Sequence, residues 1–316
     1  MEPQKELHIP SEEIYEKPKI KKPNTNKKQR SFKPKSWKPY LYLVPAVLFI
    51  FLFIYSAIFT LIYSFTDWDG INNPNWVGLQ NYQEIFSNSV FITSFINTAI
   101  WVVVSLIVPV GLGLFFSVIL QDVIGNTIFK NVFYLPYAIS LTTTGIIWSF
   151  LFSSSGFNEL FETLGFSEQW IRNWLTEPPY NTISMIIASV WQSTGTNMIL
   201  FLVGLQSLPK EPHEAAMMDG ASKLRVFFTI TLPLLKPFTV VVVGMALVNS
   251  FKVFDIIWVM TQGGPYRSSE TLAVTMYRES FVLNNLGLGS AISIVLTILI
   301  FILSWFYLRQ TIVKED

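Results

Sequence analysis

Cysteine is absent from this chain of 316 residues. Its absence excludes a disulfide framework, a thiolate nucleophile and a zinc or iron–sulfur centre held by cysteine. Charged residues make up only 14% of the chain, against about 25% in an ordinary soluble domain. Hydrophobic residues make up 51%. A chain so rich in apolar residues is not disordered, and its low charge argues against a soluble globular fold.

Long stretches without any charge divide the chain. Five of them, 28 to 37 residues long, exceed the ~20 apolar residues that a helix needs to cross a bilayer. A sixth hydrophobic stretch contains Lys252 and Asp255. Six such helices in a soluble protein would leave almost no polar surface, so we expect an all-α integral membrane protein with six transmembrane helices. The predicted spans are 39–66, 91–119, 131–153, 182–206, 237–260 and 287–309.

Lysine and arginine are distributed unevenly. Residues 1–38 contain 11 of them beside 5 acidic residues, which predicts a disordered basic tail that interacts with anionic lipid headgroups. If the N-terminus is inside the cell, the inside segments hold 18 lysines and arginines and the outside segments hold 3. Because cationic loops stay cytoplasmic, we expect a multi-pass protein of the cell membrane with both termini in the cytoplasm. Residues 39–313 form its membrane domain.

The cytoplasmic segment 211–233 differs from the other loops. Pro212 suits the first turn of a helix, and nearby glutamates complement the positive end of the helix dipole. Gly220 interrupts this helix after Asp219, which predicts a helix–turn–helix. Its alanines would suit the groove of a partner protein, whereas an amphipathic helix on the lipid headgroups is the alternative. The residues alone leave these two interpretations about even.

The same segment resembles a known motif. The residues that carry the resemblance are Glu214-Ala215-Ala216, Asp219-Gly220-Ala221, Phe227, Ile230, Leu232, Pro233 and Pro237. They are similar to the EAA loop in the membrane subunits of ABC importers. Further stretches resemble the sugar-importing branch of that family, in particular its larger maltose-type permease: 77–82, Leu135-Pro136 with Trp148, Phe254-Asp255 and 261–265. The resemblance covers most of residues 40–310, and the chain departs from that permease in having no large extracellular insert.

This resemblance implies the type I fold of ABC importer permeases and a set of partners. In that family the EAA loop inserts into a cleft of the ATPase subunit and transmits its closure to the membrane spans. The ATPase-coupling residues carried over onto this chain are Glu214, Ala215, Ala216, Asp219, Gly220, Ala221 and Pro233. The implied partners are a second permease subunit, two ATPase subunits and an extracellular solute-binding protein.

Motifs for an energy source are missing from the sequence. It has no G-x-x-x-x-G-K-[ST] phosphate loop, so we expect ATP and Mg²⁺ on the partner ATPase and no cofactor on this chain. Asp255 is the only acidic residue in a predicted span, and both histidines, His8 and His213, lie outside the spans. A proton relay is therefore not expected, and a pathway without its own motor fits a permease that works with separate ATPases. We expect no catalytic residue, no metal site and no contact with nucleic acid.

Polar residues in the fourth and fifth predicted spans are candidates for a substrate pathway. Such residues are costly in a membrane unless they face a cavity or one another, and a neutral sugar needs hydrogen-bonding groups in a mostly apolar cavity. The candidates are Gln192, Ser193, Thr196, Asn197, Asn249 and Ser250, and the resemblance implies substrate contacts at all of them except Asn197. Interhelical hydrogen bonding is the alternative, which we favour for a single serine or threonine. The long amides Gln192 and Asn249 are the better substrate candidates.

Lys252 and Asp255 lie three residues apart and are expected on one face of the fifth helix, where they could pair. The simpler interpretation is that Lys252 extends to the membrane interface and Asp255 caps the turn before Gly263. We favour it over direct substrate binding, although charges at this place would also suit an outer gate.

The sequence therefore predicts the permease subunit of an ATP-driven ABC importer for a mono- or oligosaccharide. Two alternatives stay open. A permease for another solute, such as a peptide, polyamine or phosphate, would keep the EAA loop but would show charge-matched residues along its pathway. A channel or secondary transporter would work without any ATPase.

Overall fold

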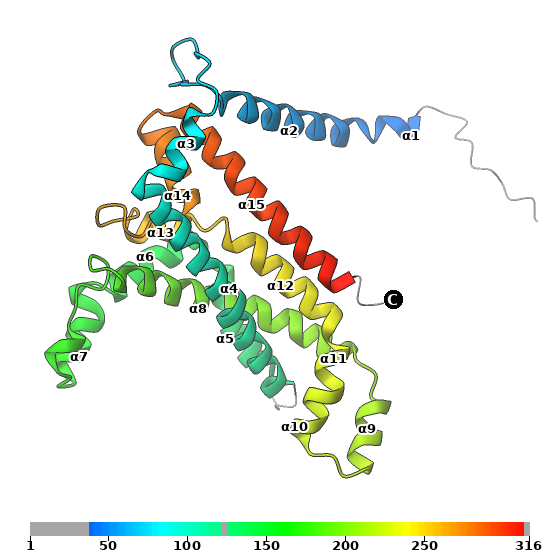
Figure 1. Cartoon of the computed structure of the whole chain (residues 1–316). Coiled ribbons are helices and arrows are strands. Elements are labelled where there is room, and N and C mark those ends of the chain that lie inside the picture. The colour runs from blue at the N-terminus through cyan, green and yellow to red at the C-terminus, as the bar shows by residue number, and fades with distance from the viewer. Residues whose placement is uncertain (1–37, 122–125, 313–316) are drawn as a thin grey trace, which may run out of the picture. The chain divides into compact units, whose positions relative to one another are not determined.

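The computed structural model describes residues 38–121 and 126–312, and this part is mostly helical. The chain divides into two compact units, Met1–Leu52 and Phe53–Asp316. The first contains α1 (Lys38–Leu41) and the start of α2 (Val44–Tyr63). The other described helices belong to the second unit, which carries the candidate site (Figure 1). Of the predicted basic tail, residues 1–37 lie outside the described residues.

Four helices in the described part of the chain are long and apolar enough to cross a membrane. They are α2, α4 (Ser89–Leu120), α8 (Tyr180–Ser207) and α15 (Leu286–Ile312). These helices coincide with the first, second, fourth and sixth predicted spans. Asn88 marks the start of α4 because its side chain accepts a hydrogen bond from the Val90 amide, at 3.0 Å.

The third and fifth predicted spans are interrupted helices. Residues 131–153 are divided between α5 (Asn126–Ala138) and α6 (Leu141–Leu151). Residues 237–260 are divided between α12 (Lys236–Ser250) and α13 (Asp255–Met260). Hydropathy measures how apolar a stretch is and not whether its backbone is continuous, so it joins the two halves of each. The count of six membrane crossings stays a prediction.

A sharp bend precedes α12. The segment 223–234 meets α12 at an angle of 70°, and the two together are apolar enough for a fifth span. This segment contains α10 (Lys223–Val226), the π-helical turn η3 (Phe227–Thr231) and α11 (Leu232–Leu234). Pro233 and Pro237 lie on either side of the bend and have no amide hydrogen for the helical ladder, which favours a change of direction here.

Close packing of α8 against its neighbours depends on glycine. A Cβ atom on Gly113 of α4 would lie 2.6 Å from the Cβ of Asn197, and one on Gly195 would lie 1.9 Å from the carbonyl oxygen of Phe133 in α5. Backbones approach this closely only where no side chain intervenes. A buried cluster of Val110, Phe201, Leu235 and Val242 joins α4, α8 and α12. Figure 1 shows α12 lying between α4 and α15.

Short elements complete the described residues. They are α3 (Gln80–Ser87), the turn η1 (Ser154–Asn158), α7 (Glu159–Thr163), the 3₁₀ turn η2 (Glu168–Trp170), α9 (Glu211–Met218), α14 (Leu272–Tyr277) and the π-helical turn η4 (Arg278–Val282). Of these, α9 lies beside α10 and α11 at the far end of α12 from α13 (Figure 1).

Candidate functional site

A cavity of 420 Å³ opens between the fourth and fifth predicted spans. Its walls come from α4, α5, α6, α8, α12 and α13, and from the break between the last two helices. All six predicted substrate residues line it: Gln192, Ser193, Thr196, Asn197, Asn249 and Ser250. Lys252 and Asp255 line it as well, together with the aromatic rings of Tyr137 and Phe254. The structure thus brings into one space polar residues that lie more than fifty positions apart in the sequence.

The α8 wall places its four polar residues on one helical face because they lie at positions i, i+1, i+4 and i+5. Gln192 is 8% exposed, and its amide nitrogen donates a hydrogen bond to the carbonyl oxygen of Ile139 at 3.3 Å. That oxygen is accessible because the break between α5 and α6 falls at this residue. Gln192 therefore makes a hydrogen bond to a neighbouring helix's end, the alternative to substrate binding, while its side chain still lines the cavity.

The two hydroxyl groups on the same face differ in whether they have a hydrogen-bond partner. The Ser193 hydroxyl donates to the carbonyl oxygen of Ser189 within its own helix, at 2.7 Å. The Thr196 hydroxyl is buried and has no hydrogen-bond partner in this structure. Burying an unpartnered hydroxyl costs about 1–3 kcal/mol, and this hydroxyl exposes almost no surface to the cavity, so a ligand would bond to it only after the side chain turns. Nothing in the sequence distinguishes Thr196 from Ser193 in this respect.

The α12 wall ends in Asn249 and Ser250. The Asn249 side chain is exposed to the cavity, and no side-chain hydrogen bond occupies it among the described residues. Ser250 is 3% exposed, and its hydroxyl donates back to the carbonyl oxygen of Leu247 at 2.7 Å. This local bond uses the donor of Ser250 inside its own last helical turn, which accompanies the end of α12. Asn249 is thus the more available of the two.

The expectation that Lys252 and Asp255 share one helix is wrong. Lys252 lies in the break after α12, and Asp255 begins α13, where its charge complements the positive end of that helix dipole. No ion pair joins them within the described residues, although both line the cavity. Helical spacing predicts pairing only if the backbone stays helical between the two residues, and here it does not. A gating role for the two residues stays a prediction.

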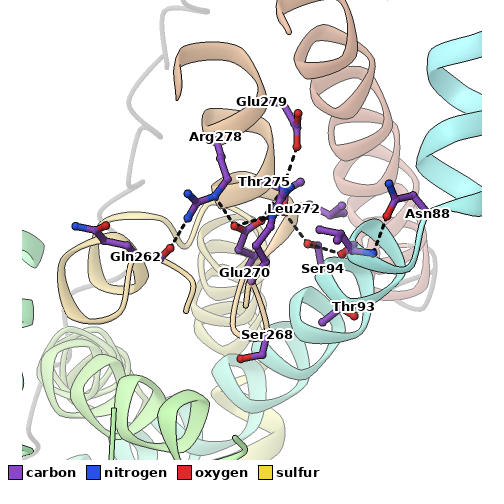
Figure 2. Close-up of polar contacts among 12 residues, drawn as sticks. Asn88, Thr93, Ser94, Gln262, Ser268, Glu270, Leu272, Thr275, Arg278 and Glu279 are labelled. Atoms are coloured by element: carbon purple, nitrogen blue, oxygen red, sulfur yellow. Dashed lines mark hydrogen bonds and ion pairs between the residues drawn. The ribbon is translucent and has the colours of Figure 1, made fainter. Parts of the chain in front are cut away.

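A buried ionic cluster in the segment 261–285 was missed by the sequence analysis. Glu270 is fully buried, and Figure 2 shows it beside Arg278 and Thr275. The Glu270 carboxylate accepts hydrogen bonds from the side chains of Arg267 (3.0 Å), Thr275 (2.7 Å) and Arg278 (2.5 Å). Arg267 also pairs with Glu279 at 3.0 Å. The only signal in the sequence is two arginines and two glutamates within thirteen residues of mostly apolar chain.

This cluster is connected to the rest of the fold through α4. Asn97 donates hydrogen bonds to the carbonyl oxygens of Ser268 and Glu270, both at 2.8 Å. Ser94 and Thr275 share a hydrogen bond of 2.6 Å (Figure 2). Burial alone would lower the pKa of Arg267, but the hydrogen bonds and charge of Glu270, with the charge of Glu279, outweigh burial and raise that pKa above its ordinary value. The polar residues at this end of α4 therefore serve to hold the 261–285 segment.

The predicted coupling segment contains the helix α9, a turn and then α10. Gly220 has φ +75°, and its amide donates to the Met217 carbonyl while the Ala221 amide donates to the Ala216 carbonyl. This pair of bonds is the Schellman pattern, which needs a left-handed residue and therefore favours glycine. The Ser222 hydroxyl then caps α10 by accepting from the Arg225 amide at 3.4 Å.

The surface of this segment is apolar in places. The most exposed large hydrophobic side chains are those of Met218 (88%), Leu224 (73%), Phe228 (62%) and Met217 (58%). Glu214, Ala215, Asp219, Gly220 and Pro233 are exposed beside them, whereas Ala216 and Ala221 are half-buried. These side chains form the exposed surface of the predicted coupling segment.

Comparisons with known proteins agree with this architecture. The model of the family described as "Binding-protein-dependent transport system inner membrane component" matches residues 110–311, which include the predicted coupling segment and most of the cavity wall. The chain is 35% identical over 273 residues to the "Probable ABC transporter permease protein YurN" of Bacillus subtilis, covering 84% of this chain and 93% of that protein. It is 34% identical over 278 residues to the "Arabinooligosaccharides transport system permease protein AraP" of the same organism, covering 86% and 87%.

A solved structure shares the fold. It is described as the "Crystal structure of bacterial alginate ABC transporter in complex with alginate pentasaccharide-bound periplasmic protein". The match has a TM-score of 0.77 at 21% identity and covers 88% of this chain and 96% of the other. At this identity the likeness concerns the fold, and it places the helices described above in the arrangement of an importer permease.

Proposed function

We propose that this chain, which belongs to the family of binding-protein-dependent transport system inner membrane components, carries a sugar across the cell membrane. The family consists of multi-pass permease subunits and not of enzymes, so ATP hydrolysis belongs to partner subunits. The observation that carries the proposal is the cavity into which Asn249, Thr196 and Gln192 converge.

The chemistry of this cavity suits a neutral carbohydrate. Its volume of 420 Å³ falls within the ~300–1,000 Å³ of small-molecule sites. Amides and hydroxyls of α8 and α12 offer donors and acceptors for sugar hydroxyls, and Tyr137 and Phe254 offer ring faces for the C–H surfaces. The name of one similar protein, which concerns arabinooligosaccharides, supports a mono- or oligosaccharide as the substrate class.

The coupling segment would link this cavity to ATP. We propose that α9, with Glu214, Ala215 and the exposed Met218, inserts into an ATPase subunit on the cytoplasmic side. Closure of two ATPase subunits, which hold ATP and Mg²⁺, would then move the base of α12 and switch the side to which the cavity opens. A second permease subunit and an extracellular solute-binding protein complete the assembly that we propose, with both termini of this chain in the cytoplasm.

Reconstitution tests this function directly. The complex of this chain with its partner permease, ATPase subunits and receptor would be placed in proteoliposomes, and ATP hydrolysis would be measured with a panel of sugar-loaded receptors. Stimulation by one loaded receptor supports the proposal. If only a receptor loaded with a charged solute stimulates an intact complex, the substrate belongs to another class. Lys252 and Asp255 provide opposite charges in the cavity for such a solute. Failure to assemble with any ATPase would refute the coupling role.

A further inference from the structure

His213 makes two hydrogen bonds that join three segments at the base of the coupling region. Its Nδ1 atom lies 3.1 Å from the carbonyl oxygen of Pro209, just after the end of α8. Its Nε2 atom lies 3.0 Å from the hydroxyl of Thr231, the last residue of η3. His213 itself belongs to α9. One imidazole ring therefore contacts the end of the fourth span, the coupling helix and the segment that leads into the fifth span.

The chemistry of the two partners determines the direction of both bonds. A carbonyl oxygen only accepts, so Nδ1 of His213 carries the hydrogen and donates to Pro209. In the neutral ring Nε2 is then an acceptor, and the Thr231 hydroxyl donates to it. Thr231 is 9% exposed and His213 is half-buried, so this bond is partly shielded from water. Both ring nitrogens are thus occupied in a single tautomer.

No other side-chain hydrogen bond connects α9 with residues 223–235 in the part of the chain that the structure describes. The Gly220 turn that joins these helices has no atom within 4 Å of the place where a Cβ would lie, so packing does not stiffen it there. Beyond Thr231, Leu235 packs with Phe201 and Val242, which leads along α12 toward the cavity. The contact between His213 and Thr231 is the direct polar link from the coupling helix to that core.

We infer that His213 is a positioning residue that makes α9 and η3 move as one body, so that displacement of the coupling helix reaches the cavity. The inference rests on the proposed coupling function and adds to it the residue through which movement passes. Without the bond between His213 and Thr231, α9 would pivot about Gly220. The ATPase would then hydrolyse ATP without changing the conformation of the cavity.

Cysteine labelling of the assembled complex measures this transmission without knowledge of the sugar. Because the natural chain has no cysteine, a Met245→Cys variant provides one thiol in the cavity wall. The rate at which N-ethylmaleimide modifies it, read by mass spectrometry on this chain, is compared with and without ATP and vanadate. ATP hydrolysis and co-purification of the ATPase are measured on the same samples.

Four substitutions are compared in that background. His213→Leu removes both bonds at similar size, and Thr231→Val removes only the shared one. Thr231→Ser keeps the hydroxyl. Thr229→Val is the matched control, since Thr229 lies on the same turn but its hydroxyl donates only to the Arg225 carbonyl, at 2.7 Å.

We expect His213→Leu and Thr231→Val to retain assembly and ATP hydrolysis. Their ATP-induced change in labelling rate should be about fivefold smaller than that of the parent, which is the scale of one hydrogen bond. A double variant that combines His213→Leu with Thr231→Val should lose no more of this change than His213→Leu alone. Thr231→Ser and Thr229→Val should behave as the parent. If Thr231→Val showed the full ATP-induced change in labelling rate, the inference would be overturned. This result would be decisive even if His213→Leu failed to assemble. A parent complex that does not assemble, or shows no change with ATP, would instead refute the proposed function.

Discussion

Glu270 provides the most direct test of the architecture, because removing its charge leaves two arginines without their main partner. In Glu270→Gln the side chain keeps its size, but Arg267 and Arg278 lose the carboxylate that they share. Both arginine side chains are mostly buried, with 26% and 21% exposed. Removing one member of a buried ion pair typically costs about 3–5 kcal/mol because the remaining charge is left uncompensated.

The lower end of that range applies to this cluster. Arg267 keeps Glu279 at 3.0 Å, and Arg278 keeps the Gln262 carbonyl and the face of Trp258, 5.3 Å from the ring centre. We therefore expect a loss of about 3 kcal/mol in the free energy of unfolding. At roughly 2–4 °C per kcal/mol for a domain of this size, the unfolding midpoint should fall by about 6–12 °C.

Thermal unfolding of the purified complex in detergent, followed by intrinsic fluorescence, measures this shift. Glu159→Gln is the matched control because Glu159 is an exposed carboxylate with no side-chain partner among the described residues. A midpoint for Glu270→Gln within about 2 °C of the parent would show that the cluster does not hold the 261–285 segment, and the reasoning from burial would be wrong.

Three further outcomes are expected. Gly220→Pro should abolish transport while the chain still inserts, because proline cannot adopt the φ of +75° found there; normal ATP-driven uptake would contradict a role for the turn. Asn249→Ala should raise the KM for uptake roughly tenfold with little change in stability, since it removes an available amide from the cavity. Gln192→Ala should in addition lower the unfolding midpoint, because it breaks the bond to Ile139. Equal effects of the two variants on stability would refute this distinction. Backbone hydrogen bonds from Ile71 and Asn72 lower the pKa of Asp69, so exchange protection of those amides should be constant from about pH 7 to 5 and be lost only as pH falls through the lowered pKa. Hydrogen exchange would show this, and Asp69→Ala, which removes the acceptor, should lose the protection already at pH 7.

Much of the membrane architecture could be predicted from hydropathy alone. The uncharged stretches place α2, α4, α8 and α15 within a few residues of their observed bounds, because crossing a bilayer demands a long apolar helix wherever it occurs. The same measure did not predict the interruption at Ile139 or the break that begins at Phe251. At Ile139 the Ser140 side chain caps α6 by accepting from the Thr143 amide, and the Ile139 carbonyl accepts from Gln192 of another helix.

The candidate site shows a similar division. Polar residues in apolar spans are costly, and this cost alone identified Gln192, Thr196 and Asn249 as residues that must face something. Their hydrogen bonds differ in ways that this cost does not predict: Gln192 donates to another helix's end, Ser250 donates within its own helix, and Thr196 has no partner. The missed cluster around Glu270 has the same cause, because spacing along the chain does not reveal that Arg267 and Arg278 approach one carboxylate.

The amino-acid sequence by itself determined that this protein lies in the membrane, where its apolar helices fall and where the predicted coupling segment turns, since these follow from hydrophobicity and from the backbone freedom of Gly220. Only the tertiary structure decided that α8 and α12 enclose one cavity, that Lys252 and Asp255 do not pair, and that His213 connects the coupling helix with Thr231. The physical reason is that each of these features depends on distances between groups far apart along the chain, which packing of whole helices establishes and no local pattern encodes.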